Sequence, residues 1–337
     1  MKKSTWILRS AAMIFLFAVS GCRENYTVVT SLLPDGSCDR IITVTSDSGK
    51  IPDVALPLPV DSTWQISWNA PAQKGEKYVF TARKHFASFE DLSREYARQR
   101  DSNKINIAIT AAKSFRWFYT YFTYRETYGE FNPFRLVPLS QFMTQDEVRR
   151  YLAGEKSDSL KKKREAWEQR NMFEEFYRGL IEAARGLNDT TLPVSLIESK
   201  KEELFVGLMG SKSNDVTNEV ATVLGTPAAR KLSNDLKSLV EGIMHKTEIA
   251  SKAGGDYVST VVMPGTILDT NAEEVKGNSV VWRFTDEHLS MADYVMQVES
   301  RSINVWALIV TGLVVLLLIA LPVWMRLRQE RRPSNAV

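Results

Sequence analysis

The side chains that could carry catalysis or hold a metal ion are few in this chain of 337 residues, and they lie far apart in the sequence. None of the three histidines, His85, His245 and His288, has a second histidine at the spacing of a metal-binding helix. Nucleophile-elbow, phosphate-loop and dinucleotide motifs do not occur either. We therefore expect no cofactor and no metal, and local spacing identifies no catalytic residue.

Paired acids are the remaining candidates for acid–base chemistry, at Glu174-Glu175, Glu202-Glu203 and Glu273-Glu274. A glycoside hydrolase needs two carboxylates flanking the scissile bond, and a fold can bring together two that are remote in sequence. Each pair here lies in a helical or loop context, where a solvated surface is the ordinary explanation. The basic run Lys161–Arg164 is explained in the same way by a solvated helix start, with anionic lipid headgroups as the functional alternative.

Cysteine chemistry is predicted at the amino terminus. Residues 1–21 have a basic start, an uncharged stretch and small residues before Cys22, which is the pattern of a secretory signal peptide. The residues Val19–Cys22 resemble the lipobox of bacterial lipoproteins, and the resemblance implies cleavage before Cys22 and its acylation, as with palmitate. The alternative is an ordinary signal peptide followed by a chance cysteine. Cys38, the other cysteine, then has no partner for an intrachain disulfide and is predicted to be a small packed residue.

A second membrane anchor is predicted near the carboxyl terminus, where Ser302–Met325 carries no charge. Roughly 20 apolar residues cross the ~30 Å hydrocarbon core of a bilayer. Trp306 and Trp324 bracket this stretch like interfacial aromatic residues, and four arginines follow it. By the positive-inside rule, the basic tail 326–337 is cytoplasmic. The bulk of the chain is then periplasmic, at a bacterial inner membrane.

The distribution of charge supports a membrane partner and not a nucleic acid. The net charge is +3, but the basic excess lies in the two ends of the chain, and the part between them is slightly acidic. A basic total of this origin does not form the patch that nucleic acid requires.

The segments between the two anchors alternate between strand and helix patterns. Residues rich in β-branched side chains predict a hairpin over Tyr26–Leu33 and Cys38–Thr45. Further strands are predicted on both sides of a helical region, over Thr63–Asn69, Glu76–Ala87, Ile105–Ala111, Phe115–Tyr128, Tyr257–Met263, Asn278–Phe284 and Ala292–Ser300.

We therefore expect an α+β fold, in which a β-rich extracytoplasmic unit is formed by the N- and C-terminal strands and carries a helical insertion. The expected boundaries are a signal peptide over 1–21, the first β-rich part over 22–132, the helical insertion over 133–253, the second β-rich part over 254–301, the transmembrane helix over 302–325 and the tail over 326–337. Because both anchors would bring the chain to the bilayer, we also expect Tyr26–Leu32 and Ala292–Ser300 to pair as antiparallel neighbours.

The aromatic run Trp117–Phe122 is the least ordinary segment of the chain. It predicts a central strand that is covered on both faces. The functional alternative is that Trp117, Tyr119 and Tyr121 line a binding site for an acyl chain or the face of a sugar.

A run near the carboxyl terminus contains Met263-Pro264-Gly265, Ile267, Thr270-Asn271, Gly277-Asn278, Val280 and Trp282. It resembles the corresponding stretch of LppM-like bacterial membrane-anchored lipoproteins, which also ends in a strand followed by a transmembrane helix. The resemblance implies a β-rich extracytoplasmic domain, for which lipid or glycolipid binding has been suggested, and it transfers no catalytic residue. Ala272 departs from the glycine usual in that family, and the helical region has no counterpart there. Turns are predicted at Pro264, Gly265, Asn271 and Gly277, because proline, glycine and asparagine favour turn conformations.

Three functions remain open from the sequence. The favoured one is a non-enzymatic binding module for a lipid, a glycan or a protein partner at the cell envelope. The alternatives are an envelope hydrolase with a carboxylate pair and a structural subunit of a membrane complex. An aromatic-lined site in the β-rich unit would favour the first, and converging carboxylates would favour the second. An exposed apolar patch on the helices would favour the third.

Overall fold

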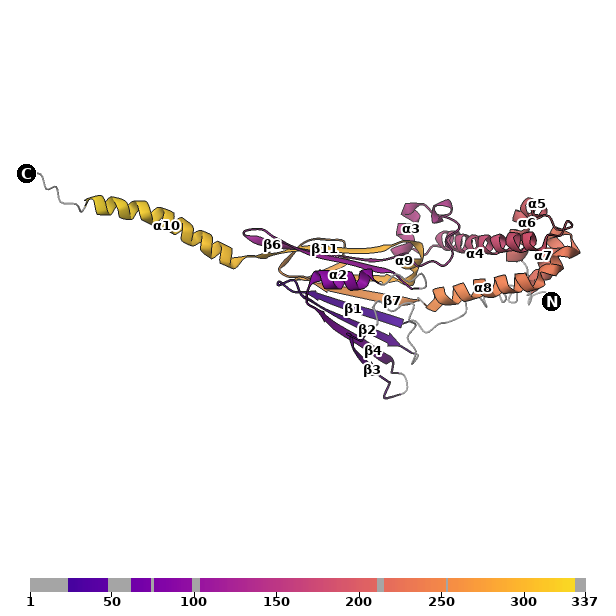
Figure 1. The fold of residues 1–337 in the computed structure, drawn as a ribbon, viewed down its shortest axis with the longest axis horizontal. Helices are drawn as coiled ribbons and strands as arrows, with labels where there is room; N and C mark the ends of the chain where they lie inside the picture. Colours follow the sequence, from indigo (N-terminus) through magenta and orange to yellow (C-terminus); the bar gives the residue numbers. More distant parts are fainter. Residues whose placement is uncertain are drawn as a thin grey trace, which may run out of the picture.

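A computed structural model describes residues 24–47, 62–73, 76–98, 104–210, 215–252 and 254–330. Two β-sheets pack face to face as a β-sandwich in the middle of an elongated molecule. A helical arm extends from one end of the β-sandwich, and a single long helix extends from the opposite end (Figure 1). The α+β class predicted from the sequence is confirmed.

The large sheet has seven strands in the order β3-β4-β2-β1-β7-β10-β9. The predicted hairpin is confirmed as its centre, and β1 also pairs in parallel with β7, whereas the other pairs are antiparallel. The strands span Glu24–Leu32 (β1), Cys38–Ser46 (β2), Gln65–Asn69 (β3), Tyr78–Phe86 (β4), Gly255–Val262 (β7), Glu274–Lys276 (β9) and Ser279–Thr285 (β10).

The small sheet has four strands in the order β5-β6-β11-β8. They span Ile107–Phe115 (β5), Tyr119–Tyr128 (β6), Thr266–Thr270 (β8) and Tyr294–Ile303 (β11). The expected pairing of the first and last strands is wrong, because β1 and β11 lie in different sheets. Both edges of β1 are taken by β2 and β7, and both edges of β11 by β6 and β8, so neither strand has a free edge for the other.

The core of the β-sandwich is formed by alternate side chains of both sheets and by one helix. On β1 and β2 the buried positions alternate regularly, as expected for strands with one face toward a core. Helix α2 (Phe89–Ala97) closes the side of the β-sandwich between β4 and β5 and buries Phe89, Leu92 and Tyr96. Ser88 caps this helix, and its hydroxyl accepts a hydrogen bond from the backbone N–H of Asp91 (3.1 Å).

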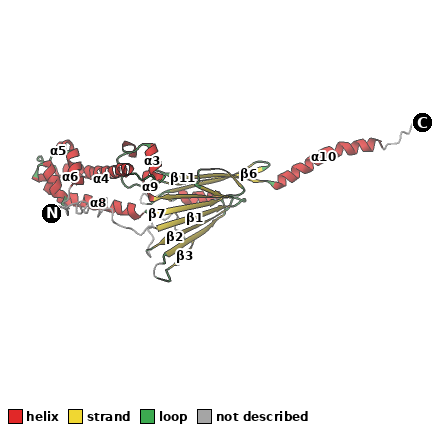
Figure 2. Cartoon of the chain, turned by 180° about the vertical axis from the view of Figure 1, so that it is seen from behind, coloured by secondary structure: helices red, strands yellow, loops and turns green. Residues whose placement is uncertain are grey.

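The helical arm consists of six α-helices and has an apolar core of its own. They span Gln145–Leu152 (α3), Asp158–Leu187 (α4), Val194–Ser199 (α5), Lys201–Gly210 (α6), Val216–Leu224 (α7) and Ser233–Lys252 (α8). The long helix α4 leads away from the β-sandwich and α8 returns beside it (Figure 2). Helix α4 has an apolar stripe, in which Phe173, Phe176, Tyr177, Leu180 and Ala184 are buried.

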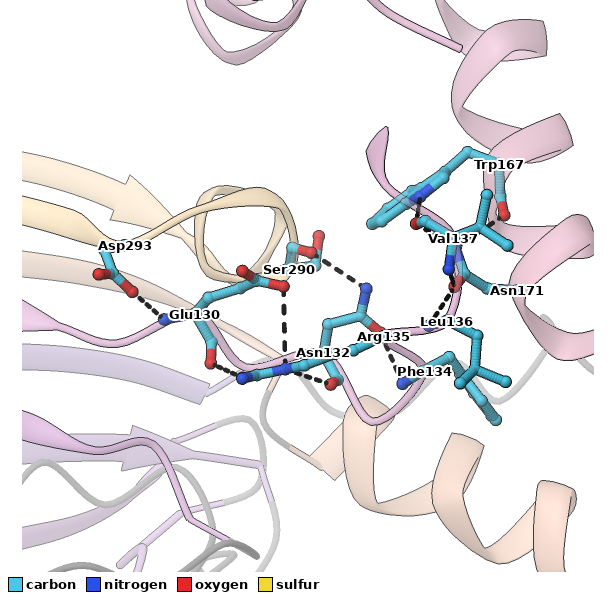
Figure 3. Close-up of polar contacts among 10 residues, drawn as sticks. All are labelled: Glu130, Asn132, Phe134, Arg135, Leu136, Val137, Trp167, Asn171, Ser290 and Asp293. Atoms are coloured by element: carbon cyan, nitrogen blue, oxygen red, sulfur yellow. Dashed lines mark hydrogen bonds and ion pairs between the residues drawn. The ribbon is translucent and has the colours of Figure 1, made fainter. Parts of the chain in front are cut away.

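A buried asparagine holds the base of the arm (Figure 3). Asn171 on α4 accepts hydrogen bonds at Oδ1 from the backbone N–H groups of Leu136 (3.1 Å) and Val137 (2.8 Å). Its Nδ2 donates to the carbonyl of Trp167 (3.1 Å), whose own indole N–H donates to the carbonyl of Val137 (2.9 Å). The segment that enters the arm is therefore fixed to α4 by the side-chain amide of Asn171.

The same segment is held to the β-sandwich a few residues earlier (Figure 3). Asn132 donates from Nδ2 to the carbonyl of Ser290 (3.4 Å), which lies in the short helix α9 (Asp286–Met291). The carboxylate of Asp293 accepts from the backbone N–H of Glu130 (2.7 Å). These contacts connect the arm to the β-sandwich through specific hydrogen bonds, which a flexible linker would lack.

The two ends of the β-sandwich carry different parts of the molecule. Tyr26 near the start of β1 stacks on Tyr257 near the start of β7, and the stack continues through Phe284 to Tyr294 at the start of β11. The helical arm joins this end. Strand β11 then runs through 10 residues to Ile303 at the other end, a distance of about 30 Å. The last helix, α10 (Val305–Glu330), starts there.

Candidate functional site

The aromatic run predicted as one buried strand is divided by a turn. Strand β5 ends at Phe115 and β6 begins at Tyr119, so Trp117 and Phe118 form the tip of a hairpin and are 48% and 40% exposed. The prediction of a strand covered on both faces is wrong. The pairing of β5 with β6 is longer than the pattern indicated, and Ala112 to Phe115 continue β5 instead of making the turn.

Tyr119 and Tyr121, predicted with Trp117 to line a binding site, lie on the outer face of the small sheet. Both are half-buried, and their ring centroids are 6.5 Å apart. The guanidinium of Arg301 lies 4.8 Å from the centroid of the Tyr119 ring. The structure therefore places two of the three residues on one open sheet face and Trp117 at the hairpin tip, and it does not gather them around an enclosed pocket.

The hairpin tip (Phe115–Phe118) is fixed to the start of α10 by one asparagine. The Nδ2 of Asn304 donates to the carbonyls of Arg116 (2.8 Å) and Trp117 (3.2 Å), and its backbone N–H donates to the carbonyl of Phe118 (2.9 Å). Its Oδ1 accepts from the hydroxyl of Thr120 (2.8 Å). The carbonyl of Asn304 also accepts the first hydrogen bonds of α10, from the N–H groups of Ala307 and Leu308. One residue thus starts the helix and holds the tip.

Aromatic contacts reinforce this junction. Trp306 stacks on Phe115 with ring centroids 6.1 Å apart and meets Trp117 edge to face at 5.4 Å. The indole N–H of Trp117 donates to the hydroxyl of Thr311 (2.9 Å), more than a turn further along α10. Ala307 is completely buried at this contact, whereas α10 residues beyond it are largely exposed.

A second exposed aromatic surface lies on the large sheet, at the edge formed by β3 and β4. Across its inner face, the register aligns one row of side chains from β3 to β10, namely Trp68, Phe80, Val44, Tyr26, Tyr257 and Phe284. The part of this row under the small sheet is buried, but Trp68 remains 42% exposed. Its ring lies 5.9 Å from that of Tyr78 and 6.1 Å from that of Phe80.

We call this surface, formed by Ile66, Trp68, Tyr78 and Phe80, the open margin. These side chains point to the same face as the buried residues Ile42 and Val44, as the pairings of β2, β4 and β3 show. The face remains open there because four strands cannot cover seven. Sequence reasoning found the alternation of Trp64, Ile66 and Trp68 but not the exposure of Ile66 and Trp68, because the width of the opposing sheet is not encoded in β3.

The centre of the β-sandwich contains a charged group. Arg40 on β2 pairs with Glu126 on β6, and both side chains are fully buried. Arg40 also donates to the hydroxyls of Thr30 (2.7 Å) and Tyr124 (3.1 Å), and its guanidinium lies 4.8 Å from the centre of the Tyr96 ring. Burial alone would lower the pKa of Arg40, but the Glu126 carboxylate and the surrounding tyrosines hold it well above its ordinary value. The arrangement keeps a charged pair in the interior, where neither side chain is exposed to solvent.

Other titratable groups near this centre are kept neutral. Burial raises the pKa of Tyr124 well above its ordinary value, and the Glu126 carboxylate acts in the same direction. Burial also raises the pKa of the Cys38 thiol to about 12, so this cysteine is an unreactive packed residue, as predicted. Cys22, the predicted acylation site, lies outside the described residues.

The paired acids of the sequence are each engaged by a cation. Arg170 lies 3.0 Å from Glu174 and 2.7 Å from Glu202, and Lys246 pairs with Glu175. Glu273 and Glu274 both face Arg283, and Glu203 pairs with Lys200. These contacts neutralise the carboxylates at the surface, where an acid–base pair of a hydrolase would need two that face a common cleft.

The histidines and the basic run are likewise accounted for locally. His288 lies in α9, and its Nδ1 accepts from the backbone N–H of Thr285 (3.2 Å). In the basic run, Lys163 pairs with Glu147 and Arg164 with Glu168. Within the part of the chain that the structure describes, no cluster of three or more His, Cys, Asp or Glu side chains could hold a metal ion.

Comparisons with known proteins give one structural neighbour. No family model and no curated protein matches the chain. Among solved structures, the NMR structure of the folded domain of LppM from Mycobacterium tuberculosis is 9% identical, with a TM-score of 0.32, and the match covers 84% of this chain and 92% of that one. This is a distant structural similarity, and membership of the family resembled in sequence remains a prediction.

Proposed function

We propose that this chain is a membrane-anchored, extracytoplasmic binding module that holds the apolar chain of an envelope lipid on its open margin. The observation that carries the proposal is the row of inner-face side chains that is buried from Val44 to Phe284 and continues uncovered to Trp68. Apolar side chains that extend a core beyond its cover are a common feature of surfaces that bind apolar ligands.

The chemistry of the open margin favours an acyl chain over a glycan. Its members are Ile66, Trp68, Tyr78 and Phe80, of which only Tyr78 and the indole N–H of Trp68 offer polar atoms. Sugar recognition uses aromatic faces together with several hydrogen-bonding side chains, whereas an acyl chain needs only apolar contact, at about 0.8 kcal/mol for each CH₂ removed from water.

Anchorage by α10 is part of the proposal. Residues Val305–Arg326 form a helix long and apolar enough to cross a bilayer. We place the carboxyl terminus in the cytoplasm and the β-sandwich outside it, because arginines follow the helix. A bacterial inner membrane and a periplasmic location agree with the predicted signal peptide.

The lipid has two possible sources, a separate envelope lipid and the chain's own acylated Cys22. Three residues separate Cys22 from Tyr26, so an acylated Cys22 would lie within about 14 Å of the end of the β-sandwich that carries the arm, at ~3.5 Å for each of the four steps. The open margin lies toward this same end, since Tyr78 pairs with Ser46 at the end of β2. The start of α10 is at the opposite end, about 30 Å away.

The proposal is tested by titrating the full-length protein in detergent micelles with a fluorescent long-chain fatty acid, at fatty acid concentrations below saturation. Trp68→Ala should weaken binding about 10-fold or more, which corresponds to about 1.4 kcal/mol. Val275→Ala is the matched control, because Val275 is an exposed apolar residue on the opposite edge of the same sheet. The comparison is made in a Cys22→Ser background, in which no acyl group of the chain itself can occupy the open margin. Equal binding with and without Trp68→Ala in that background would overturn the role of the open margin.

The source is resolved by repeating the titration with Cys22→Ser and by labelling cells with radioactive palmitate. Palmitate in the wild type but not in Cys22→Ser would establish acylation. If the chain's own acyl groups occupy the open margin, the added fatty acid should bind only to Cys22→Ser. If the ligand is a separate lipid, both proteins should bind it.

A further inference from the structure

We propose that the hairpin tip is a second membrane contact, which inserts its aromatic side chains into the outer-leaflet interface of the bilayer that α10 crosses. The partner of this surface is a phospholipid bilayer. The inference concerns the opposite end of the β-sandwich from the open margin. It rests on the anchorage by α10 proposed above, but not on lipid binding at the open margin.

The position of the hairpin tip along α10 is the first observation. The indole of Trp117 reaches Thr311, which is six residues beyond the start of α10 at Val305. At 1.5 Å per residue, the hairpin tip extends about 9 Å along the axis of the helix. A helix that crosses the ~30 Å apolar core with residues 305–326 therefore carries the tip into the interfacial layer.

The composition of the turn is the second observation. The hairpin reverses direction at Trp117-Phe118, between Arg116 and Tyr119, whose backbone groups exchange hydrogen bonds. Neither Trp117 nor Phe118 has a positive φ, so this turn does not need the Asn or Gly of the common two-residue hairpin turns. The turn therefore accommodates two bulky aromatic residues at its most protruding point.

The exposed residues around the hairpin tip form the third observation. Phe115, Trp117, Phe118, Ile303, Val305 and Trp306 are all 40% exposed or more, and they continue without a break into the apolar surface of α10. Tryptophan and other aromatic rings are enriched at the level of the lipid headgroups. Arg116, also exposed, has a long side chain that can reach the phosphates from this depth.

The rigidity of the junction makes the contact obligatory. Asn304 holds the tip by three hydrogen bonds to consecutive carbonyls, at Arg116, Trp117 and Phe118. Because the tip cannot leave α10 without losing them, insertion of the helix positions the tip at the interface as well. The β-sandwich is then held by two points of contact, which restrict its tilt and rotation.

Spin labels measure the depth of the hairpin tip in the full-length protein reconstituted into phosphatidylcholine–phosphatidylglycerol vesicles. Phe118→Cys carries the label at the tip, and Ala108→Cys carries the matched control at the exposed far end of β5. Both are made in a Cys22→Ser background, because the remaining Cys38 is buried. Power saturation with O₂ and with a water-soluble nickel chelate then compares the two sites.

We expect the Phe118 label to be more accessible to O₂ than to nickel, and the Ala108 label to show the reverse. Equal access of nickel to both labels would overturn the inference, because the tip would then be in water. Protection of the Phe118 label from both reagents would also overturn it, because protein and not lipid would then cover the tip. Circular dichroism of each labelled variant checks that it has folded.

Discussion

Arg40 and Glu126 face each other from different sheets, with Nη2 and Oε1 2.5 Å apart and neither side chain exposed to solvent. Their partners, Thr30 and Tyr124, also come one from each sheet. A buried charge that loses its partner is costly, so this ion pair couples the relative position of the two sheets to the stability of the fold.

Replacement of Glu126 alone should be strongly destabilising. Glu126→Gln leaves the guanidinium of Arg40 buried without an opposite charge, and we expect a loss of about 3–5 kcal/mol in the free energy of unfolding. The double variant R40M/E126L removes both charges and should recover most of this loss. Denaturant unfolding in detergent, followed by tryptophan fluorescence, measures both. A double variant as unstable as the single one would show that the pair is net stabilising.

The Pro264-Gly265 turn should tolerate no side chain. Gly265 has φ +77°, and a Cβ there would lie 2.1 Å from the carbonyl oxygen of Arg301 on β11. Gly265→Ala should therefore lower the melting temperature much more than Gly277→Ala, whose φ is +63° but whose Cβ would have nothing within 4 Å. The control should cost only about 1–2 kcal/mol, for the left-handed backbone. Similar losses in both variants would contradict the close approach.

His288 should make stability depend on pH. Burial lowers the pKa of His288 below its ordinary 6.5, while Glu287 and Glu273 act in the opposite direction. Its neutral form is the one favoured in the folded state, so its contribution is complete above about pH 6.5 and is lost as the pH falls below that value. Between pH 7.5 and 5.5 the wild type should lose more thermal stability than His288→Gln, which keeps a capping side chain. Equal losses would exclude His288 as the titrating group.

Asn171→Ala should loosen the base of the helical arm. The substitution leaves the N–H groups of Leu136 and Val137 without their acceptor, at a cost of about 1–3 kcal/mol for each buried group. Amide hydrogen exchange should rise at Leu136 and Val137 and remain unchanged in β1. Asn132→Ala, at the other end of the segment, is the comparison, and it should affect the contact with Ser290 instead.

Local signals predicted most of the individual elements. Richness in β-branched residues identified β1 and β2, and alternation of apolar and polar residues identified β3, β4 and β11. The aromatic segment was misassigned as one continuous strand because its turn carries no local signal. Nothing in Trp117-Phe118 marks a turn, because the turn there lacks glycine, asparagine and proline.

Arrangement and exposure were not predictable from local patterns. Trp68 and Trp282 both lie on strands in which apolar and polar residues alternate. Trp282 is buried and donates a hydrogen bond to Asn271, whereas Trp68 lies beyond the edge of the small sheet. Of the residues in the hairpin tip, only Trp117 was predicted as a candidate binding residue. Its neighbour on α10, Trp306, was predicted as an interfacial residue, but the contact between them depends on Asn304, whose role no local pattern indicates.

The parallel pairing of β1 with β7 also constrains the order in which the chain can fold. Tyr26 lies opposite Tyr257, so this central contact of the large sheet waits for a residue that leaves the ribosome 231 positions later. Until then the second edge of β1 is unpaired, and such an edge is a template for aggregation. The helical arm, whose core is local, can form in the interval, whereas the β-sandwich closes late and slowly. We therefore expect the β1–β2 hairpin to be the segment of the nascent chain that most needs protection by a chaperone.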